Sequence, residues 1–159
     1  MLFRSTSAPD FDRYPQPGAE AQAVSEADEC AYVAHDVEDA VNAGLLKFED
    51  LRRDGPDLWR QALDAAEELC AENSRADLGM DLERVMLRRA TSMVIKELIG
   101  DVVRAATQRI REGRVKSSED VRARDEPTIS ASTAGRLLRD STTDFMMERV
   151  YRQIGRAHV

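Results

Sequence analysis

The chain has 159 residues, of which 33% are charged and 42% hydrophobic, and its formal net charge is −7. This acidic balance argues against a sequence-specific nucleic-acid binder, which normally has a basic surface. No stretch approaches the roughly 18 apolar residues that a membrane-spanning helix needs, so we expect no membrane partner. Two cysteines are too few for a disulfide framework, which favours a cytoplasmic protein. The acidity is concentrated, because residues 1–50 carry 3 basic and 11 acidic side chains.

The first half of the chain is predicted to be helical after an irregular start. Residues 1–18 hold three prolines and a glycine without an apolar period, which indicates an irregular lead-in. A long helix is predicted over 19–42, and Gly44 provides a stop signal just beyond it. A short helical turn is expected at 48–51. The sequence Asp54-Gly55-Pro56 then interrupts the helical pattern, and a second main helix is predicted over 57–72.

The second half continues the helical pattern. A third main helix is predicted over 81–112, with Asp81 as a suitable N-cap and Gly113 at its end. Residues 114–135 are expected to be mostly irregular, with a short helical turn near Ser117. A last helix is predicted over 134–153. No strand pattern of useful length appears, so the fold class is all-α with about four main helices.

Apolar residues at helical spacing predict which faces are buried. The expected set is Leu58, Ala62, Ala65 and Leu69 in the second helix; Leu82, Val85, Met86, Met93, Leu98, Val102, Ala106 and Ile110 in the third; and Leu137, Leu138, Phe145, Met146, Val150 and Tyr151 in the last.

Within the first helix, Asp28, Tyr32 and Asp36 occupy positions i, i+4 and i+8. Each step of four residues drifts only about 40° around a helix, so the three side chains share one stripe. His35 borders this stripe. Carboxylates suit hard divalent cations, and a phenol can pack on a sugar or form a hydrogen bond with it. The alternative interpretation is an ordinary solvated acidic face.

The segment around this stripe resembles a helix of the dNTP triphosphohydrolases, the dGTPase-like branch of the HD-domain superfamily. The resemblance rests on Glu20-Ala21-Gln22, Ala27-Asp28-Glu29, Ala31-Tyr32, His35-Asp36, Glu38-Asp39 and Ala43-Gly44-Leu45. Weaker similarity extends downstream, so that residues 19–153 can be placed on the C-terminal helical part of an HD-type domain.

The resemblance implies a role for each residue of the stripe. Asp28 would be the last carboxylate ligand of the catalytic metal, expected to be Mg²⁺ or Mn²⁺. Tyr32 would face the deoxyribose, and Asp36 would lie beside the sugar or phosphate end of the substrate. Glu29 would lie near the metal. The dipeptide His35-Asp36 is not interpreted as the metal-binding His-Asp pair, which in the family lies upstream.

The implied activity is metal-dependent hydrolysis of a dGTP-like substrate to a deoxynucleoside and triphosphate. A single carboxylate cannot hold a catalytic metal, so the chain is expected to be a fragment that lacks the upstream His and His-Asp ligands and is inactive alone. Basic side chains must offset the acidic helix for a triphosphate to approach, and Arg84, Arg88 and Arg89 are the candidates. The resemblance also implies a homo-oligomer.

Two further expectations complete the analysis. The alternative function is a non-catalytic helical interaction module that presents an acidic surface to a partner. The last six residues, 154–159, resemble the translation of a sequencing-library adapter and are expected to be a non-native tail.

Overall fold

The computed structural model describes residues 14–72 and 82–152, and all regular secondary structure in the described part is helical. The expected Asp81 cap, most of the lead-in and the 154–159 tail lie outside these residues. The helices are α1 (Ala19–Asn42), α2 (Phe48–Asp54), α3 (Asp57–Glu72), α4 (Leu82–Glu112), α5 (Ser118–Arg122) and α6 (Thr133–Met146), and α6 continues into the π-helical segment η1 (Met147–Tyr151). The predicted all-α class is confirmed. No helix in this part of the chain is long and apolar enough to cross a membrane.

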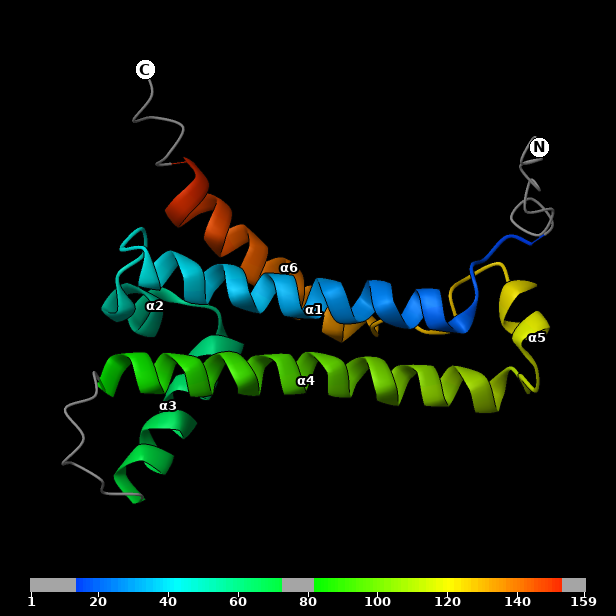
Figure 1. Cartoon of the computed structure of the whole chain (residues 1–159), viewed down its shortest axis with the longest axis horizontal. Coiled ribbons are helices and arrows are strands. Elements are labelled where there is room, and N and C mark those ends of the chain that lie inside the picture. Colours follow the sequence, from blue (N-terminus) through cyan, green and yellow to red (C-terminus); the bar gives the residue numbers. More distant parts are fainter. Residues whose placement is uncertain (1–13, 73–81, 153–159) are drawn as a thin grey trace, which may run out of the picture.

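The two longest helices, α1 and α4, lie side by side and run in opposite directions (Figure 1). α1 begins and ends as predicted, and Gly44 just beyond it has a φ of 72°, the left-handed conformation that suits glycine at a helix end. The inner face of α1 consists of small residues, Cys30, Ala34 and Val37, each with no exposed surface. Small side chains allow α1 to approach α4 closely.

The buried faces of α3 and α4 differ in part from the prediction. In α3 the buried residues are Trp59, Ala62, Leu63 and Ala66, whereas Leu69 is exposed. In α4 the predicted Leu82 and Ile110 are exposed, and Leu87, Ala90 and Val94 are buried in the core instead. Both helices carry apolar residues on more than one face, so packing against neighbouring helices decides which face is covered.

The start of α6 is fixed to the middle of α4 by a polar contact. Asp101 accepts hydrogen bonds from the backbone N–H and the hydroxyl of Ser132, at 2.8 and 2.7 Å. The Ser132 hydroxyl in turn accepts from the Gly135 N–H and caps α6. A Cβ atom at Gly135 would overlap the Asp101 carboxylate, so this close approach requires glycine.

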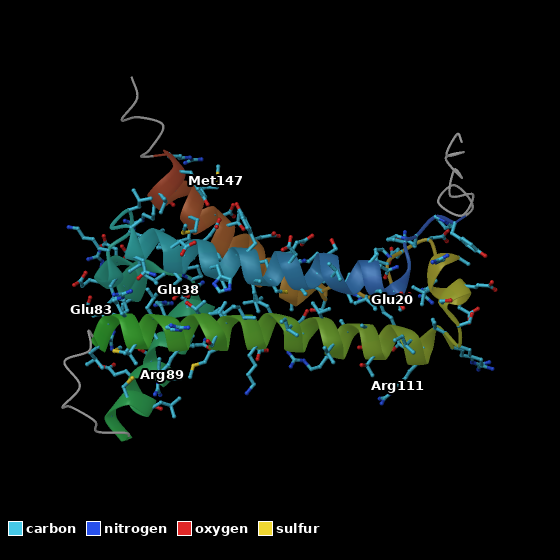
Figure 2. The ribbon with its side chains drawn as sticks, viewed as in Figure 1. Glu20, Glu38, Glu83, Arg89, Arg111 and Met147 are labelled. Atoms are coloured by element: carbon cyan, nitrogen blue, oxygen red, sulfur yellow. The ribbon has the colours of Figure 1, made fainter. Side chains whose placement is uncertain are left out.

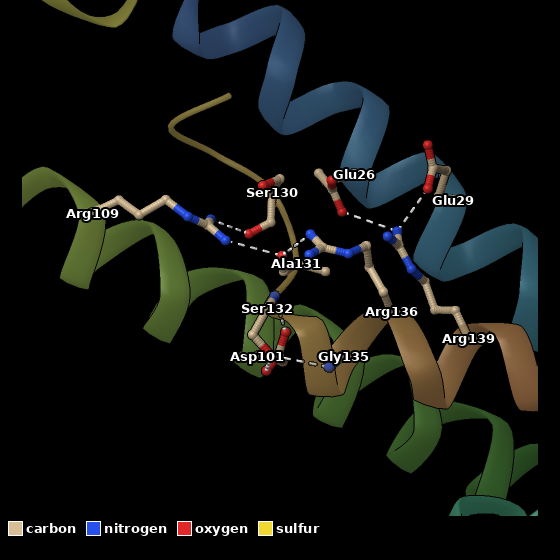
Figure 3. Close-up of polar contacts among 10 residues, drawn as sticks. All are labelled: Glu26, Glu29, Asp101, Arg109, Ser130, Ala131, Ser132, Gly135, Arg136 and Arg139. Carbon is tan, nitrogen blue, oxygen red and sulfur yellow. Dashed lines mark hydrogen bonds and ion pairs between the residues drawn. The ribbon is translucent and has the colours of Figure 1, made fainter. Parts of the chain in front are cut away.

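The irregular segment before α6 is held by two side chains from other elements. The Arg109 guanidinium of α4 donates to the carbonyls of Ser130 and Ala131 (Figure 3). The buried Gln22 amide of α1 accepts from the Ile129 N–H and donates to the Pro17 carbonyl, both at 2.9 Å. These contacts satisfy backbone groups of a segment that forms no helix of its own, and they place α6 against α1.

Candidate functional site

The Asp28–Tyr32–Asp36 stripe lies on α1 away from its packed face. Asp28 and Tyr32 are exposed, the Tyr32 side chain at 64%, and Asp36 is half-buried. Because α1 is an unbroken helix, these three residues lie on one side of it, as predicted. The sequence did not predict which side of α1 faces the core. The outward stripe is available to a ligand or to another protein segment.

Beside the stripe, α6 places a buried arginine against two α1 carboxylates (Figure 3). Nη1 of Arg139 lies 3.0 Å from Oε2 of Glu26 and 2.7 Å from Oε2 of Glu29. The Arg139 and Glu26 side chains are 10% and 14% exposed, whereas that of Glu29 is 57% exposed. The pairing compensates two of the acids of α1, and it gives Glu29, predicted to lie near the metal, a partner within the chain.

Cys30 lies close to Arg139, Glu26 and Glu29. Burial raises the pKa of the Cys30 thiol, and the carboxylates of Glu26 and Glu29 act in the same direction, against the opposing effect of Arg139. A buried thiol with a raised pKa is a poor nucleophile and a poor metal ligand at neutral pH. Cys30 is therefore a packing residue of α1.

At its far end, α6 reaches the other end of the stripe. The Tyr151 hydroxyl of η1 donates a hydrogen bond of 2.7 Å to Oδ2 of Asp36. This bond, with partial burial, raises the pKa of Tyr151 to about 12, and the nearby Tyr32 phenol adds to the shift. The two phenols and the Asp36 carboxylate therefore form one group at the edge of α1. Two residues earlier in η1, Arg149 lies 2.7 Å from Oδ2 of Asp54 at the end of α2.

Other predicted site residues are not joined to this group. Nδ1 of His35 lies 3.9 Å from the Glu38 carboxylate on its own helix. Arg88 is exposed and Arg89 half-buried on α4, and Figure 2 shows Arg89 on that helix and Glu38 on α1. Within residues 14–72 and 82–152, no hydrogen bond or ion pair joins either arginine to the stripe. Arg84 instead borders a pocket of about 310 Å³ with Val41 and Phe48, near the end of α1.

The described residues do not complete a metal site. No group of three or more His, Cys, Asp or Glu side chains among them is arranged to hold a metal ion. A catalytic metal needs several protein ligands with open positions for water and substrate. Asp28 by itself supplies one carboxylate, so no step through a metal follows from this chain alone.

Two residues of this region were not identified from the sequence. Tyr151 was predicted to lie on the buried face of the last helix, but its side chain is 40% exposed and its hydroxyl reaches Asp36. Arg139 was given no role, yet it is the buried partner of Glu26 and Glu29. A basic residue within the apolar face of a helix is the signal that could have indicated Arg139.

Comparison with known proteins points to one group of relatives, although no family model matches the chain. The chain is 32% identical over 145 residues to a deoxyguanosinetriphosphate triphosphohydrolase-like protein of Syntrophus aciditrophicus, covering 91% of this chain and 35% of that protein. A protein of Deinococcus radiodurans with the same description is 36% identical over 137 residues, covering 86% and 34%. The corresponding Geobacter sulfurreducens protein is 32% identical over 136 residues, covering 86% and 33%.

These matches confirm the resemblance inferred from α1. The chain spans about a third of the length of the curated relatives that it matches, which is consistent with the expected C-terminal part. By sequence, this chain is therefore similar to about a third of the length of the deoxyguanosinetriphosphate triphosphohydrolase-like proteins, and the regular elements of its described residues are all helices.

Proposed function

We propose that this chain contributes the Asp28–Tyr32–Asp36 face of α1 to a site that hydrolyses a deoxynucleoside triphosphate, such as dGTP, to the deoxynucleoside and triphosphate. The observation that carries the proposal is the outward stripe of two carboxylates and a phenol on the helix that bears the family resemblance. The names of the relatives support the same class of reaction. We further propose that residues 19–153 form the C-terminal part of an HD-type domain, in a protein that assembles as a homo-oligomer.

Asp28 is proposed as one ligand of a divalent metal, Mg²⁺ or Mn²⁺. Its exposed carboxylate has the hard oxygen donors that these ions prefer. Because the described residues offer no complete ligand set, the remaining ligands have to come from elsewhere in the family fold. Such a metal, when bound, would supply charge compensation and an activated water for attack at the α-phosphorus.

Tyr32 and Asp36 are proposed to bind the sugar side of the substrate. The Tyr32 ring is exposed and can pack against a deoxyribose, leaving little room for a 2′-hydroxyl. The Asp36 carboxylate accepts hydrogen bonds and repels phosphate, so a sugar hydroxyl is the group that it suits. In the reaction, water adds to the α-phosphorus, the bond from phosphorus to the 5′ oxygen breaks, and that oxygen is protonated.

The triphosphate needs cations, and the described part of α1 has none. Arg139 does not meet this need, because its guanidinium is buried and paired with Glu26 and Glu29. Arg88, exposed on α4, and Arg89, half-buried on the same helix, remain our candidates for phosphate contacts.

The test is a fusion in which the full chain replaces the matched part of the Syntrophus relative. We expect the fusion to release triphosphate from dGTP in the presence of Mg²⁺ or Mn²⁺, and the isolated chain to release none. Asp28→Asn in the fusion should reduce the rate by at least about a hundredfold, because one metal ligand is lost. Asp144→Asn is the matched control, since Asp144 is an exposed carboxylate of α6 outside the stripe.

Each outcome discriminates between the two functional hypotheses. Full activity of the Asp28→Asn fusion would refute the metal-ligand role. A folded fusion that releases no triphosphate from any dNTP would refute the hydrolase proposal and favour the alternative, a non-catalytic helical module with an acidic surface.

A further inference from the structure

The end of α6 is built in a way that an ordinary α-helix would not allow. The segment Met147–Tyr151 is π-helical, with hydrogen bonds from residue i to i+5. In a regular α-helix, the 12 residues from Arg139 to Tyr151 would rotate the second side chain about 120° away from the first. The wider π turn advances less per residue and brings Tyr151 back towards the side that Arg139 occupies. Both side chains consequently contact α1.

The π segment is anchored by residues that directly precede Tyr151. Val150 and Met146 are 3% exposed and lie in the core, while Arg149 pairs with Asp54 of α2. These contacts fix the backbone from which the phenol projects. Tyr151 is 40% exposed, and its hydroxyl is held by the hydrogen bond to Asp36.

The contact leaves the other side of the carboxylate available. Oδ2 of Asp36 accepts the Tyr151 hydroxyl, and within the described residues no hydrogen bond to Oδ1 is found. Tyr32, one turn earlier on α1, is close enough to Tyr151 to affect its ionisation. A hydrogen bond to one oxygen of a carboxylate holds the whole group in one orientation. The lone pairs of the other oxygen then point in a fixed direction. This is the arrangement needed to accept a hydrogen bond from a ligand hydroxyl.

We propose that Tyr151 is a positioning residue: by donating to Oδ2 of Asp36, it orients the second carboxylate oxygen, on the same side of α1 as Tyr32, towards a hydroxyl group of the substrate. This inference rests on the proposed function and adds a residue from a different helix to the site. Without the phenol, the Asp36 side chain would be free to rotate, and part of the binding energy would be lost in ordering it.

The contact is tested first in the isolated full chain, with no ligand. The chain has three tyrosines, so ¹³C-labelled tyrosine gives three ring signals that Tyr→Phe variants assign. With a pKa of about 12, Tyr151 should remain mostly protonated at pH 11, whereas an ordinary tyrosine is mostly ionised there. Asp36→Asn should make Tyr151 titrate close to an ordinary tyrosine. No change on Asp36→Asn would overturn the proposal.

The functional role is tested in the fusion described above. Tyr151→Phe should lower kcat/KM for dGTP by about tenfold, as expected for the loss of one charge-assisted hydrogen bond at a partly exposed site. In an Asp36→Ala background, the same change should have no further effect. Tyr14→Phe is the matched control, because Tyr14 lies beside Arg122 at the other end of the molecule.

The double variant separates positioning from a structural role. Equal losses from Tyr151→Phe in both backgrounds would overturn the proposal, because a residue that only stabilises the fold does not act through Asp36. An inactive parent fusion would instead refute the proposed function, and with it the role of Tyr151 in substrate positioning. The tyrosine titration would still show in that case whether the contact to Asp36 exists.

Discussion

The two faces of α1 have opposite chemistry on one continuous helix. The inner face, with Cys30, Ala34 and Val37, has no exposed surface and no charge. The outer face presents Asp28 and Tyr32 to solvent, and its edge is contacted by α6. Packing of the inner face determines where α1 lies, but it does not determine which residues occupy the outer face. Asp28 and Tyr32, which are exposed and do not pack in the core, are the part of this stripe available for function.

The largest loss of stability should come from a cavity in the core beside the inner face of α1. Leu87 of α4 is 1% exposed, belongs to the core and borders the same pocket as Val41 of α1. We expect Leu87→Ala to lower the free energy of unfolding by about 2–5 kcal/mol. Urea denaturation followed by circular dichroism measures this change. Leu137→Ala is the control, since Leu137 is 64% exposed and should change stability little.

The second largest loss of stability should come from removing Arg139, which joins α6 to α1. Arg139→Met leaves the Glu26 carboxylate, which is 14% exposed, without its partner, while the more exposed Glu29 can return to water. We therefore expect a loss of about 3 kcal/mol, at the lower end of the range for a broken buried ion pair. Adding Glu26→Gln to Arg139→Met should recover part of this loss. A double variant no more stable than Arg139→Met would contradict the explanation.

The Tyr151 contact predicts an alkaline dependence of stability. The folded chain releases the phenol proton at a pKa of about 12, whereas the unfolded chain releases it near the ordinary value of about 10. The hydrogen bond thus contributes fully below pH of about 10, and its contribution falls as the pH rises towards about 12. Thermal unfolding across this range should show a smaller decline for Tyr151→Phe than for the parent chain. An identical decline in both proteins would show that the contact does not form in solution.

The reactivity of the two cysteine thiols tests the burial of the inner face of α1 without any mutation. Cys30 is fully buried with a raised pKa, whereas Cys70 of α3 is half-buried. Iodoacetamide at pH 8 should modify Cys70 first, and Cys30 only at the rate of unfolding. Mass spectrometry of the two peptides measures both rates. Rapid modification of Cys30 in the native chain would place the inner face of α1 in contact with solvent.

The smallest effect should come from the outer stripe itself. Asp28→Asn removes an exposed charge that has no partner among the described residues, so the free energy of unfolding should change by less than about 0.5 kcal/mol. Denaturation of the isolated chain measures it. A large loss would mean that Asp28 supports the fold, and the loss of activity expected in the fusion could then not be assigned to the site.

The sequence predicted the helices better than the contacts between them. The bounds of α1 followed from an Ala- and Glu-rich stretch that ends before Gly44, and those of α3 from the break before Asp57. The expected turn near Ser117 is α5, closed by reciprocal bonds between Ser117 and Asp120. These features are local, so residues a few positions apart determine them.

The missed features all depend on residues distant in the chain. In α3, apolar residues occur at two overlapping spacings, and only the packing of Trp59 and Leu63 shows which is buried. The stripe from Asp28 to Asp36 was predictable from a spacing of four, but its outward direction depends on where α4 lies. The π turn of η1 has no simple local signal, so the direction of Tyr151 could not be predicted.

The joint between Ser132, Gly135 and Asp101 has a mechanical consequence for the far end of α6. Because the first turn of α6 is pinned to α4, tilting of this helix pivots there. Arg139 lies only about 6 Å along the axis from Gly135, whereas Tyr151 lies about 20 Å away. A tilt of about 5° would thus displace the Arg139 backbone by about 0.5 Å and that of Tyr151 by nearly 2 Å. The Arg149–Asp54 ion pair and the buried Val150 oppose such a displacement, so the phenol contact depends on anchors at both ends of the helix.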